Sequence, residues 1–452
     1  MKWRKQCANS HSKHSFFGLL VIQLLIGGLN RAVLLGQSLS LVQCQEYAIR
    51  SSLDVQKAGL RVETDRINAQ LTHQAGLPSW GLSLSEGVNL GHTIDPFSNT
   101  FLQETIHSGT LGLSSSVMLF NGFRQKYQEQ QQLFTRRADE ATLQQQKLEL
   151  RRQVTAAYMQ LLLSQELLQL ATEQRQFVVV QLNRAKALVQ EGVLPKIGLT
   201  DWEAQLATAD YEVLTARANL QQNRLALQWV MNWRESSDLS IESIAVPEPQ
   251  PPTALTTWID ELPSRISRHP AVQSAEWQLK SAQTGYAIAK SGLYPSIALG
   301  IGINTAYSSV APPDLIAFGR QLQYNLGQYI RLNVSFPTTS FRTTQLQMAL
   351  AEVNRKSTAL DIQKARLQVN QTLEQGKALL LSAYEKWQQA QKQVEAQQRA
   401  VKAAKARYDE GLLQSVELAL IQANLVKALS NQVQARYEWH FRKLLLDQFV
   451  DR

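Results

Sequence analysis

The side chains that most often carry catalysis or bind metals are few in this chain and do not cluster along it. His92 and His107 fall in segments of loop-like composition, whereas His269 and His440 stand in helix-like segments. These histidines do not have the spacing of a metal site, and no glycine-rich phosphate loop follows a strand-like segment. We therefore predict that the chain is not an enzyme and has no cofactor and no metal.

The N-terminus changes how charge and cysteine content are read. An apolar run of about fourteen residues, 16–29, follows several Lys and Arg, which predicts a cleaved secretory signal at about 1–38; it is shorter than the ~20 residues of a membrane-spanning helix. Removing the five Lys+Arg of residues 1–36 lowers the formal net charge from +9 to +4. No basic stripe with interleaved aromatic residues remains, so we predict no nucleic-acid partner.

Once the signal is removed, Cys44 is the only cysteine, which excludes an intrachain disulfide. We interpret it as a buried thiol rather than a lipidation site.

Short motifs of the chain recur 217 to 219 residues later. The pairs are Pro78-Ser79 with Pro295-Ser296, Phe123-Arg124 with Phe341-Arg342, and Glu191-Gly192 with Glu410-Gly411. So long a period predicts duplication of a whole structural module rather than a solenoid. We place the first repeat at 39–235, the second at 257–452, and a proline-rich linker at 236–256 between them.

Each repeat contains two segments in which large apolar residues alternate with small or polar ones. Strict period two over about eight to ten residues predicts strands with two unlike faces. One apolar face and one small, polar face suit lipid on one side and water on the other, although a half-buried sheet on a core is the alternative for any single strand. We predict hairpins at about 78–120 and 294–337, with surface loops at about 91–109 and 306–325. The residues predicted to face lipid are Trp80, Leu82, Leu84, Leu299, Ile301, Leu332 and Val334.

The remaining segments predict helices of three kinds. Two long ones, about 125–190 and 343–410, are rich in Gln, Ala, Leu, Glu and Arg, and about seventy helical residues would rise ~105 Å. Return helices are predicted at about 199–235 and 415–449, and leading helices at about 40–76 and 257–293. Their narrow, alanine-rich apolar stripes are similar to a coiled-coil seam. An elongated coiled-coil protein of the cell envelope is therefore the alternative, but it does not explain the hairpins.

Four strands per chain are too few to close a membrane barrel, which starts at about eight strands. Open sheet edges are not tolerated in lipid, so the chain must assemble with copies of itself. Three copies would supply twelve strands and leave a channel, which makes a homotrimer the simplest closed arrangement. A stand-alone diffusion porin is the other alternative, but such a porin does not need helices of ~100 Å.

This order of elements resembles the TolC family of outer-membrane channel proteins over essentially the whole chain after the signal. The segments that carry the resemblance are the opening helix 39–49, the helix-to-strand junction 291–296, and the two helical tips 191–205 and 408–423. The resemblance implies a mixed α and β fold with two internal repeats, in which a trimeric twelve-stranded transmembrane β-barrel continues into a long α-helical, coiled-coil-like periplasmic barrel. It also implies a passive exit duct in the outer membrane of a Gram-negative bacterium. Such a duct serves a tripartite efflux pump or a type I secretion system, with an inner-membrane transporter of RND or ABC type and a periplasmic adaptor as partners.

The resemblance also assigns roles at the two tips, about 191–198 and 410–415. The residues expected to dock the adaptor are Gly192, Val193, Leu194, Gly411, Leu412 and Leu413, for which a simple helix stop is the alternative. Tyr408 and Glu417 are expected at the periplasmic gate, where Glu417 would supply three carboxylates in a trimer; a solvated surface glutamate is the alternative. The arginine and second aspartate of the family's gate fall on Leu413 and Leu420, so part of that polar network is missing.

Overall fold

The computed structural model describes residues 38–94, 99–192, 195–234, 239–242, 246–251, 266–310, 317–338 and 340–450. The chain divides into two compact units. The unit that contains the sheet comprises residues 54–146 and 263–372, and the unit that contains the helical tips comprises residues 1–53, 147–262 and 373–452. Apart from Ser38, the predicted signal segment lies outside the described residues.

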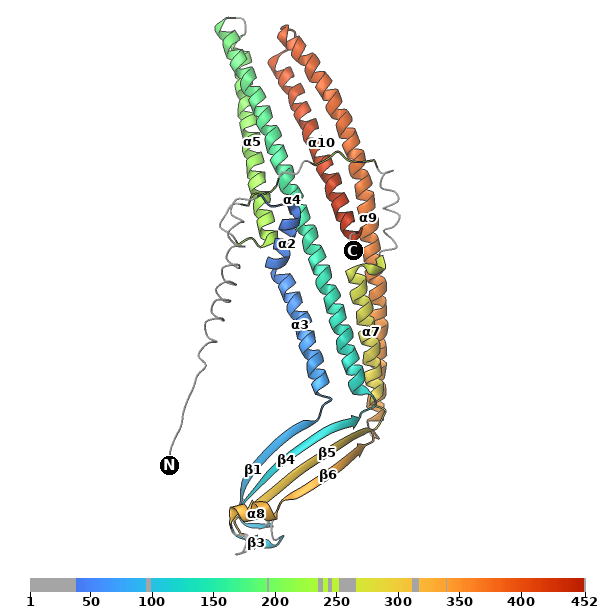
Figure 1. Cartoon of the computed structure of the whole chain (residues 1–452). Helices are drawn as coiled ribbons and strands as arrows, with labels where there is room; N and C mark the ends of the chain where they lie inside the picture. The colour runs from blue at the N-terminus through green and yellow to red at the C-terminus, as the bar shows by residue number, and fades with distance from the viewer. Residues whose placement is uncertain are drawn as a thin grey trace, which may run out of the picture. The chain divides into compact units, whose positions relative to one another are not determined.

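Helices make up most of the described chain (Figure 1). They are α2 (Leu41–Ser51), α3 (Leu53–Gln74), α4 (Arg124–Gln190), α5 (Lys196–Met231), α7 (Pro270–Ser291), α8 (Phe318–Tyr324), α9 (Phe341–Asp409) and α10 (Ser415–Val450). The long helices α4 and α9 contain 67 and 69 residues, so each rises about 100 Å. Within the described segments, no helix is both long and apolar enough to cross a bilayer.

Four antiparallel strands form the main sheet in the order β1-β4-β5-β6 (Figure 1). They are β1 (Ser79–Asn89), β4 (Ile106–Phe120), β5 (Ser296–Ser308) and β6 (Gly327–Ser335). Each predicted hairpin is therefore present, and β4 and β5 join the two hairpins into one sheet. Among the described strands, the outer strands β1 and β6 each pair with one neighbour only, so the sheet has two open edges.

The strand register places the large apolar side chains on one face. Trp80 pairs with Ser115 and Ser115 with Ile301, while Leu82 pairs with Leu113 and Leu113 with Ile303. Because directly paired residues point to the same side of a sheet, all seven residues predicted to face lipid share this face. We call it the apolar face and the opposite one the small face.

One polar side chain on the apolar face has a specific partner. The Tyr307 hydroxyl hydrogen-bonds to the carboxylate of Glu86, and the tyrosine ring crosses Gly109, which lies between them in the register. A Cβ atom at Gly109 would come 2.6 Å from that ring. A glycine at this position therefore allows Tyr307 to satisfy Glu86.

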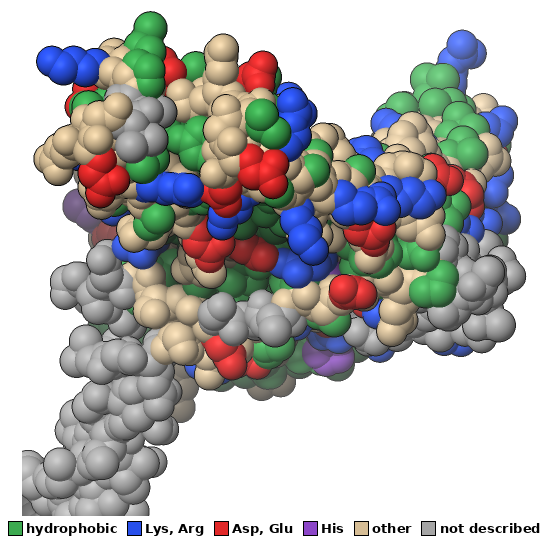
Figure 2. All heavy atoms as spheres, turned by 90° about the horizontal axis from the view of Figure 1, so that it is seen from above, with side chains coloured by type: hydrophobic (Ala, Val, Ile, Leu, Met, Phe, Trp, Pro, Cys, Tyr) green, Lys and Arg blue, Asp and Glu red, His purple; other side chains and the backbone are tan. Residues whose placement is uncertain are grey.

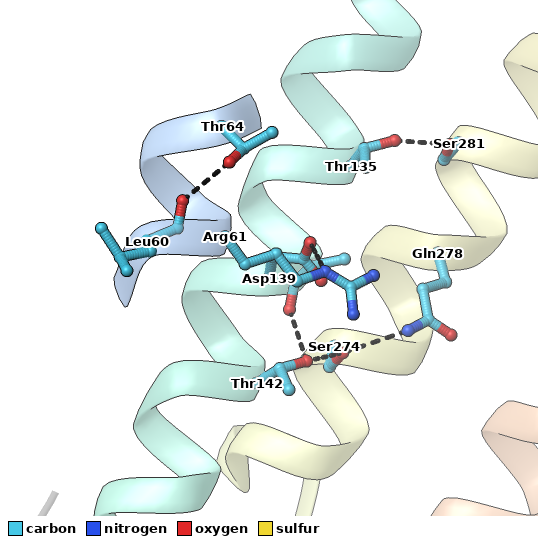
Figure 3. Close-up of polar contacts among 10 residues, drawn as sticks. Leu60, Arg61, Thr64, Thr135, Asp139, Thr142, Ser274, Gln278 and Ser281 are labelled. Carbon is cyan, nitrogen blue, oxygen red and sulfur yellow. Dashed lines mark hydrogen bonds and ion pairs between the residues drawn. The ribbon is translucent and has the colours of Figure 1, made fainter. Parts of the chain in front are cut away.

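The helices next to the sheet are joined by hydroxyl contacts. The hydroxyls of Thr135 and Ser281 lie 3.1 Å apart, and those of Thr142 and Ser274 lie 2.9 Å apart (Figure 3). Seven residues separate the two positions on each helix, which is the repeat of a coiled-coil seam. Small polar side chains at these positions allow α4 and α7 to pack closely.

A pair of buried aspartates lies between α3 and α4. Asp65 and Asp139 are each 7% exposed. Arg61 Nε donates to Asp139 Oδ2 at 2.7 Å (Figure 3). Three effects raise the pKa of Asp65 to about 6: burial first, then a hydrogen bond that the protonated Asp65 carboxyl donates to Asp139, and then the negative charge of Asp139. The positive charge of Arg61 opposes the shift. The two carboxyl groups therefore share one proton at mildly acidic pH.

The predicted leading helix 40–76 is two helices, because Ser52 adopts an extended backbone between α2 and α3. The break is held by the end of α5: Asn232 Nδ2 donates to the Ser51 carbonyl at 2.9 Å, and the Ser51 hydroxyl donates to the Met231 carbonyl. In the same unit Cys44 is fully buried, and this burial raises the pKa of its thiol to about 12.

The predicted surface loops contain more regular structure than expected. The first holds a small two-stranded sheet, β2 (His92–Ile94) with β3 (Phe101–Gln103). The second holds the short helix α8, whose Gln321 side chain accepts from the backbone N–H of Ser308 at 2.8 Å and donates to its carbonyl at 3.0 Å. The second leading helix, predicted at 257–293, is described from Pro270 onward as α7, and residues 252–265 lie outside the described chain.

Candidate gate and docking site at the helical tips

Two glycine turns close the helical hairpins, α4–α5 and α9–α10. Gly192 has φ +73° and Gly411 has φ +74°, and an added Cβ would contact nothing within 4 Å at either position. The second turn has the Schellman pattern, because Gly411 N–H donates to the Tyr408 carbonyl at 3.1 Å and Leu412 N–H to the Arg407 carbonyl at 2.8 Å. Left-handed backbone, rather than crowding, is what requires glycine here.

The predicted docking residues of the second tip differ in their surroundings. Leu412 is 66% exposed, whereas Leu413 packs against the apolar cluster beneath the tip. Val193 and Leu194 lie outside the described residues. Exposed apolar side chains continue onto the first two turns of the return helices, at Ile197, Val416 and Leu420. The tips thus present apolar surface that sequence reasoning placed only in the turns.

Beneath the turns, all four helices share one apolar cluster. Trp202 of α5 is completely buried, and Leu418 of α10 nearly so. Small residues, Ala185 on α4 and Ala404 on α9, allow the helices to approach this indole. The cluster therefore connects the first helical hairpin with the second.

Near the turns, three polar contacts also join the two hairpins, and we call them the tip links. The Arg184 guanidinium donates to Asp409 Oδ1 at 2.5 Å, the Ser415 hydroxyl donates to Asp201 Oδ2 at 2.7 Å, and Trp202 Nε1 donates to the Tyr408 hydroxyl oxygen at 3.2 Å. In addition, the Arg184 guanidinium lies 5.8 Å from the centroid of the Tyr408 ring.

The tip links are individually weak. Arg184 and Asp409 are each 42% exposed, so their ion pair contributes about 0.2–1 kcal/mol. The link between Ser415 and Asp201 is charge-assisted and adds about 1 kcal/mol or more. Removing the Tyr408 hydroxyl would leave the indole N–H of buried Trp202 without its acceptor, at a cost of about 1–3 kcal/mol. Each link therefore contributes a few kcal/mol at most to the contact between the two hairpins.

The two predicted gate residues have different positions. Tyr408 takes part in the links, whereas Glu417 is exposed in the first turn of α10 and makes no hydrogen bond or ion pair with any described residue. Sequence reasoning missed Arg184, Trp202 and Asp409 as link residues. Their partners are more than 200 residues away, and no local spacing marks them. Basic and acidic side chains lie interspersed on the face that Figure 2 shows, so charge clustering did not mark them either.

The fold and its paired helical tips define a class of outer-membrane channel. The outer membrane efflux protein family matches the chain twice, over residues 46–232 and 262–449. The chain therefore belongs to this family, which confirms the resemblance to TolC-type channels. Its members are outer-membrane conduits of Gram-negative bacteria and not enzymes, and they work in general as homotrimers with adaptor and inner-membrane pump partners.

Solved structures of similar fold come from several bacteria. The outer membrane protein VceC of Vibrio cholerae has a TM-score of 0.74 at 14% identity, covering 91% of this chain and 95% of its own. The MtrE outer membrane channel of Neisseria gonorrhoeae, in its open state, has a TM-score of 0.71 at 17% identity, covering 91% and 88%. The CmeC channel of Campylobacter jejuni has a TM-score of 0.70 at 15% identity, covering 90% and 85%. No curated protein sequence matches the chain.

Proposed function

We propose that three copies of this chain form the outer-membrane exit duct of a tripartite efflux pump. The duct passively conducts substrates that an inner-membrane transporter and a periplasmic adaptor deliver. The observation that carries the proposal is the sheet: one face is apolar along all four strands, and both edges are open. The same chain also contains two long helical hairpins, which a simple diffusion pore does not need.

The open edges supply the reason for self-assembly. Unpaired backbone groups of β1 and β6 are too costly to leave in lipid, so β6 of one copy would pair with β1 of the next. Three copies then close twelve strands, with Trp80, Leu82 and Leu84 of β1 turned to lipid. The same face of the other strands brings Leu299, Ile301, Leu332 and Val334 to the lipid.

The helices attached to the two edge strands support the same assembly. Exposed aliphatic residues recur every seven positions on α3, at Leu53, Leu60 and Ile67, and on α9, at Leu346, Val353, Leu360 and Leu367. A seven-residue apolar repeat is the pattern of a coiled-coil seam. Because α3 leads into β1 and α9 leaves β6, edge pairing between copies would bring these two rows together.

At the tips, we propose that the links keep the duct narrow until the adaptor binds. Gly192, Val193, Leu194, Gly411, Leu412 and Leu413 would dock the adaptor. Leu412 is the exposed apolar contact, and Leu413 supports it from below. At this gate, Glu417 would add a ring of three carboxylates. Tyr408 would contribute through its link to Trp202.

Cysteine crosslinking tests the assembly directly. In a Cys44→Ala background, Leu60→Cys combined with Val353→Cys should give disulfide-linked dimers and trimers on denaturing gels. The control replaces Asn354 instead of Val353, which turns the thiol by about 100° around α9. Purified protein that runs only as a monomer, shows equal linkage in both variants, or forms no ion-conducting pore in planar bilayers contradicts the proposal.

A further inference from the structure

Arg331 stands out on the small face of the sheet. Most residues on this face are glycine, serine, alanine or asparagine. One row of directly paired residues across the four strands is Ser79, Ser116, Gly300 and Arg331. Among the residues that the four main strands place there, Arg331 is the only charged one. The four main strands place no carboxylate on that face to neutralise it.

The surroundings leave the Arg331 side chain room and hold it in place. Its direct neighbour on β5 is Gly300, followed by Ser116 on β4, so no large side chain covers the guanidinium from that side. The guanidinium lies 5.3 Å from the centroid of the Tyr329 ring, two positions along β6. Arg331 itself is exposed.

The position of Arg331 along its strand indicates whether its side chain faces lipid or water. Arg331 is the middle residue of β6 (Gly327–Ser335). In a membrane strand, the middle is where an arginine facing lipid is most costly, and a position facing a water-filled interior avoids that cost. The one acidic side chain of the opposite face, Glu86, is bound to Tyr307 and does not face Arg331.

We propose that Arg331 forms a ring of positive charge inside the duct that favours anionic over cationic solutes. The inference rests on the proposed trimer, which places three copies of Arg331 at one level of the barrel wall. The low-dielectric wall concentrates the field of such a ring into the water-filled interior. At 0.01 M salt the field reaches about 30 Å, and at 1 M about 3 Å, so selectivity falls as salt rises.

Reversal potentials in planar bilayers test this inference with the purified trimer in a KCl gradient. Arg331→Ala should shift the permeability ratio toward K⁺, and Arg331→Glu should shift it further, with both shifts larger at low than at high salt. Arg331→Lys keeps the charge and should behave as the unmodified protein. Glu86→Gln alters a charge on the opposite face and should leave the ratio unchanged. The series is repeated with Arg184→Ala, since a narrow tip would otherwise dominate the measured potential.

The outcomes separate this inference from the duct itself. If the unmodified protein conducts and Arg331→Glu shows the same permeability ratio in both backgrounds, the charge ring is wrong and the duct stands. If Glu86→Gln shifts the ratio as much as Arg331→Ala does, the assignment of faces is wrong. If no variant conducts in either background, the proposed function fails and the ring fails with it.

Discussion

Loss of Arg184 should open the tips without unfolding the helices. Arg184→Ala removes the ion pair with Asp409 at 2.5 Å and the contact with the Tyr408 ring at 5.8 Å. Both contacts run from the first helical hairpin to the second. No contact of Arg184 within its own hairpin is described, so the change weakens the link and leaves each hairpin as it was.

The expected size follows from the exposure of the two charges. A half-exposed ion pair contributes about 0.2–1 kcal/mol, and an exposed cation–π contact about 0.5–1 kcal/mol. The sum, about 0.7–2 kcal/mol per chain, shifts the balance between joined and separated hairpins about three- to thirty-fold. Adding Ser415→Ala removes the bond to Asp201 and should increase the effect.

Single-channel recording in planar bilayers measures this balance as open probability and conductance. The matched control is Arg175→Ala, because Arg175 pairs with Asp210 at the same 2.5 Å and with similar exposure, but within one hairpin. Arg184→Ala should raise open probability and Arg175→Ala should not. Raising KCl toward 1 M should partly reproduce the effect in unmodified protein by screening. Equal behaviour of the two variants would refute a role for the link in gating.

Two further predictions concern stability, measured as unfolding of the purified protein in detergent. The folded-state pKa of Asp65, raised to about 6, lies above its unfolded value of 3.8, so unfolding free energy should fall as pH rises from about 4 to 6. The Asp65→Asn variant should not show that fall, and at pH 7.5 it should be more stable than the unmodified protein by at most about 3 kcal/mol. If the variant keeps the pH profile of the unmodified protein, the shared proton is contradicted. Gly411→Ala should cost about 1–2 kcal/mol because of its left-handed backbone. Gly59→Ala, in open space within α3, should instead stabilise by about 0.5–1 kcal/mol, and equal effects would remove the backbone argument.

The sheet was predictable from sequence because its information is local. Alternation of large and small residues fixes which side chains share a face, and the observed pairing of Leu299 with Leu332 follows that parity. By the same parity, Glu86 falls on the apolar face as an exception. Its partner, Tyr307, was not predictable, because it lies 221 residues away and reaches Glu86 only across the glycine of a third strand.

The helices were predictable in extent but less so in their breaks and contacts. Composition predicted α4 and α9 to within two residues at each end. The break at Ser52 depends on bonds from Ser51 and Asn232 that close only when α5 packs beside α2. Tyr408 was found through a resemblance, whereas its donor Trp202 was not, because a buried tryptophan on a helix has no signature that separates a link from core packing.

The tip links explain why divergence of the two repeats matters. The tips share a backbone, with Gly192 and Gly411 in the same conformation, and matching positions lie 219 residues apart. At that offset the position of Asp201 is occupied by Leu420, and that of Ser415 by Lys196. Each link joins non-equivalent positions of the two tips. The reciprocal positions, Ala403 and Gln190 for the ion pair and Lys196 and Leu420 for the serine–aspartate bond, lack the required side chains, so each link can form only once per chain. Replacing a link residue by its counterpart in the other tip, as in Asp201→Leu, should therefore weaken closure even where it preserves both helices.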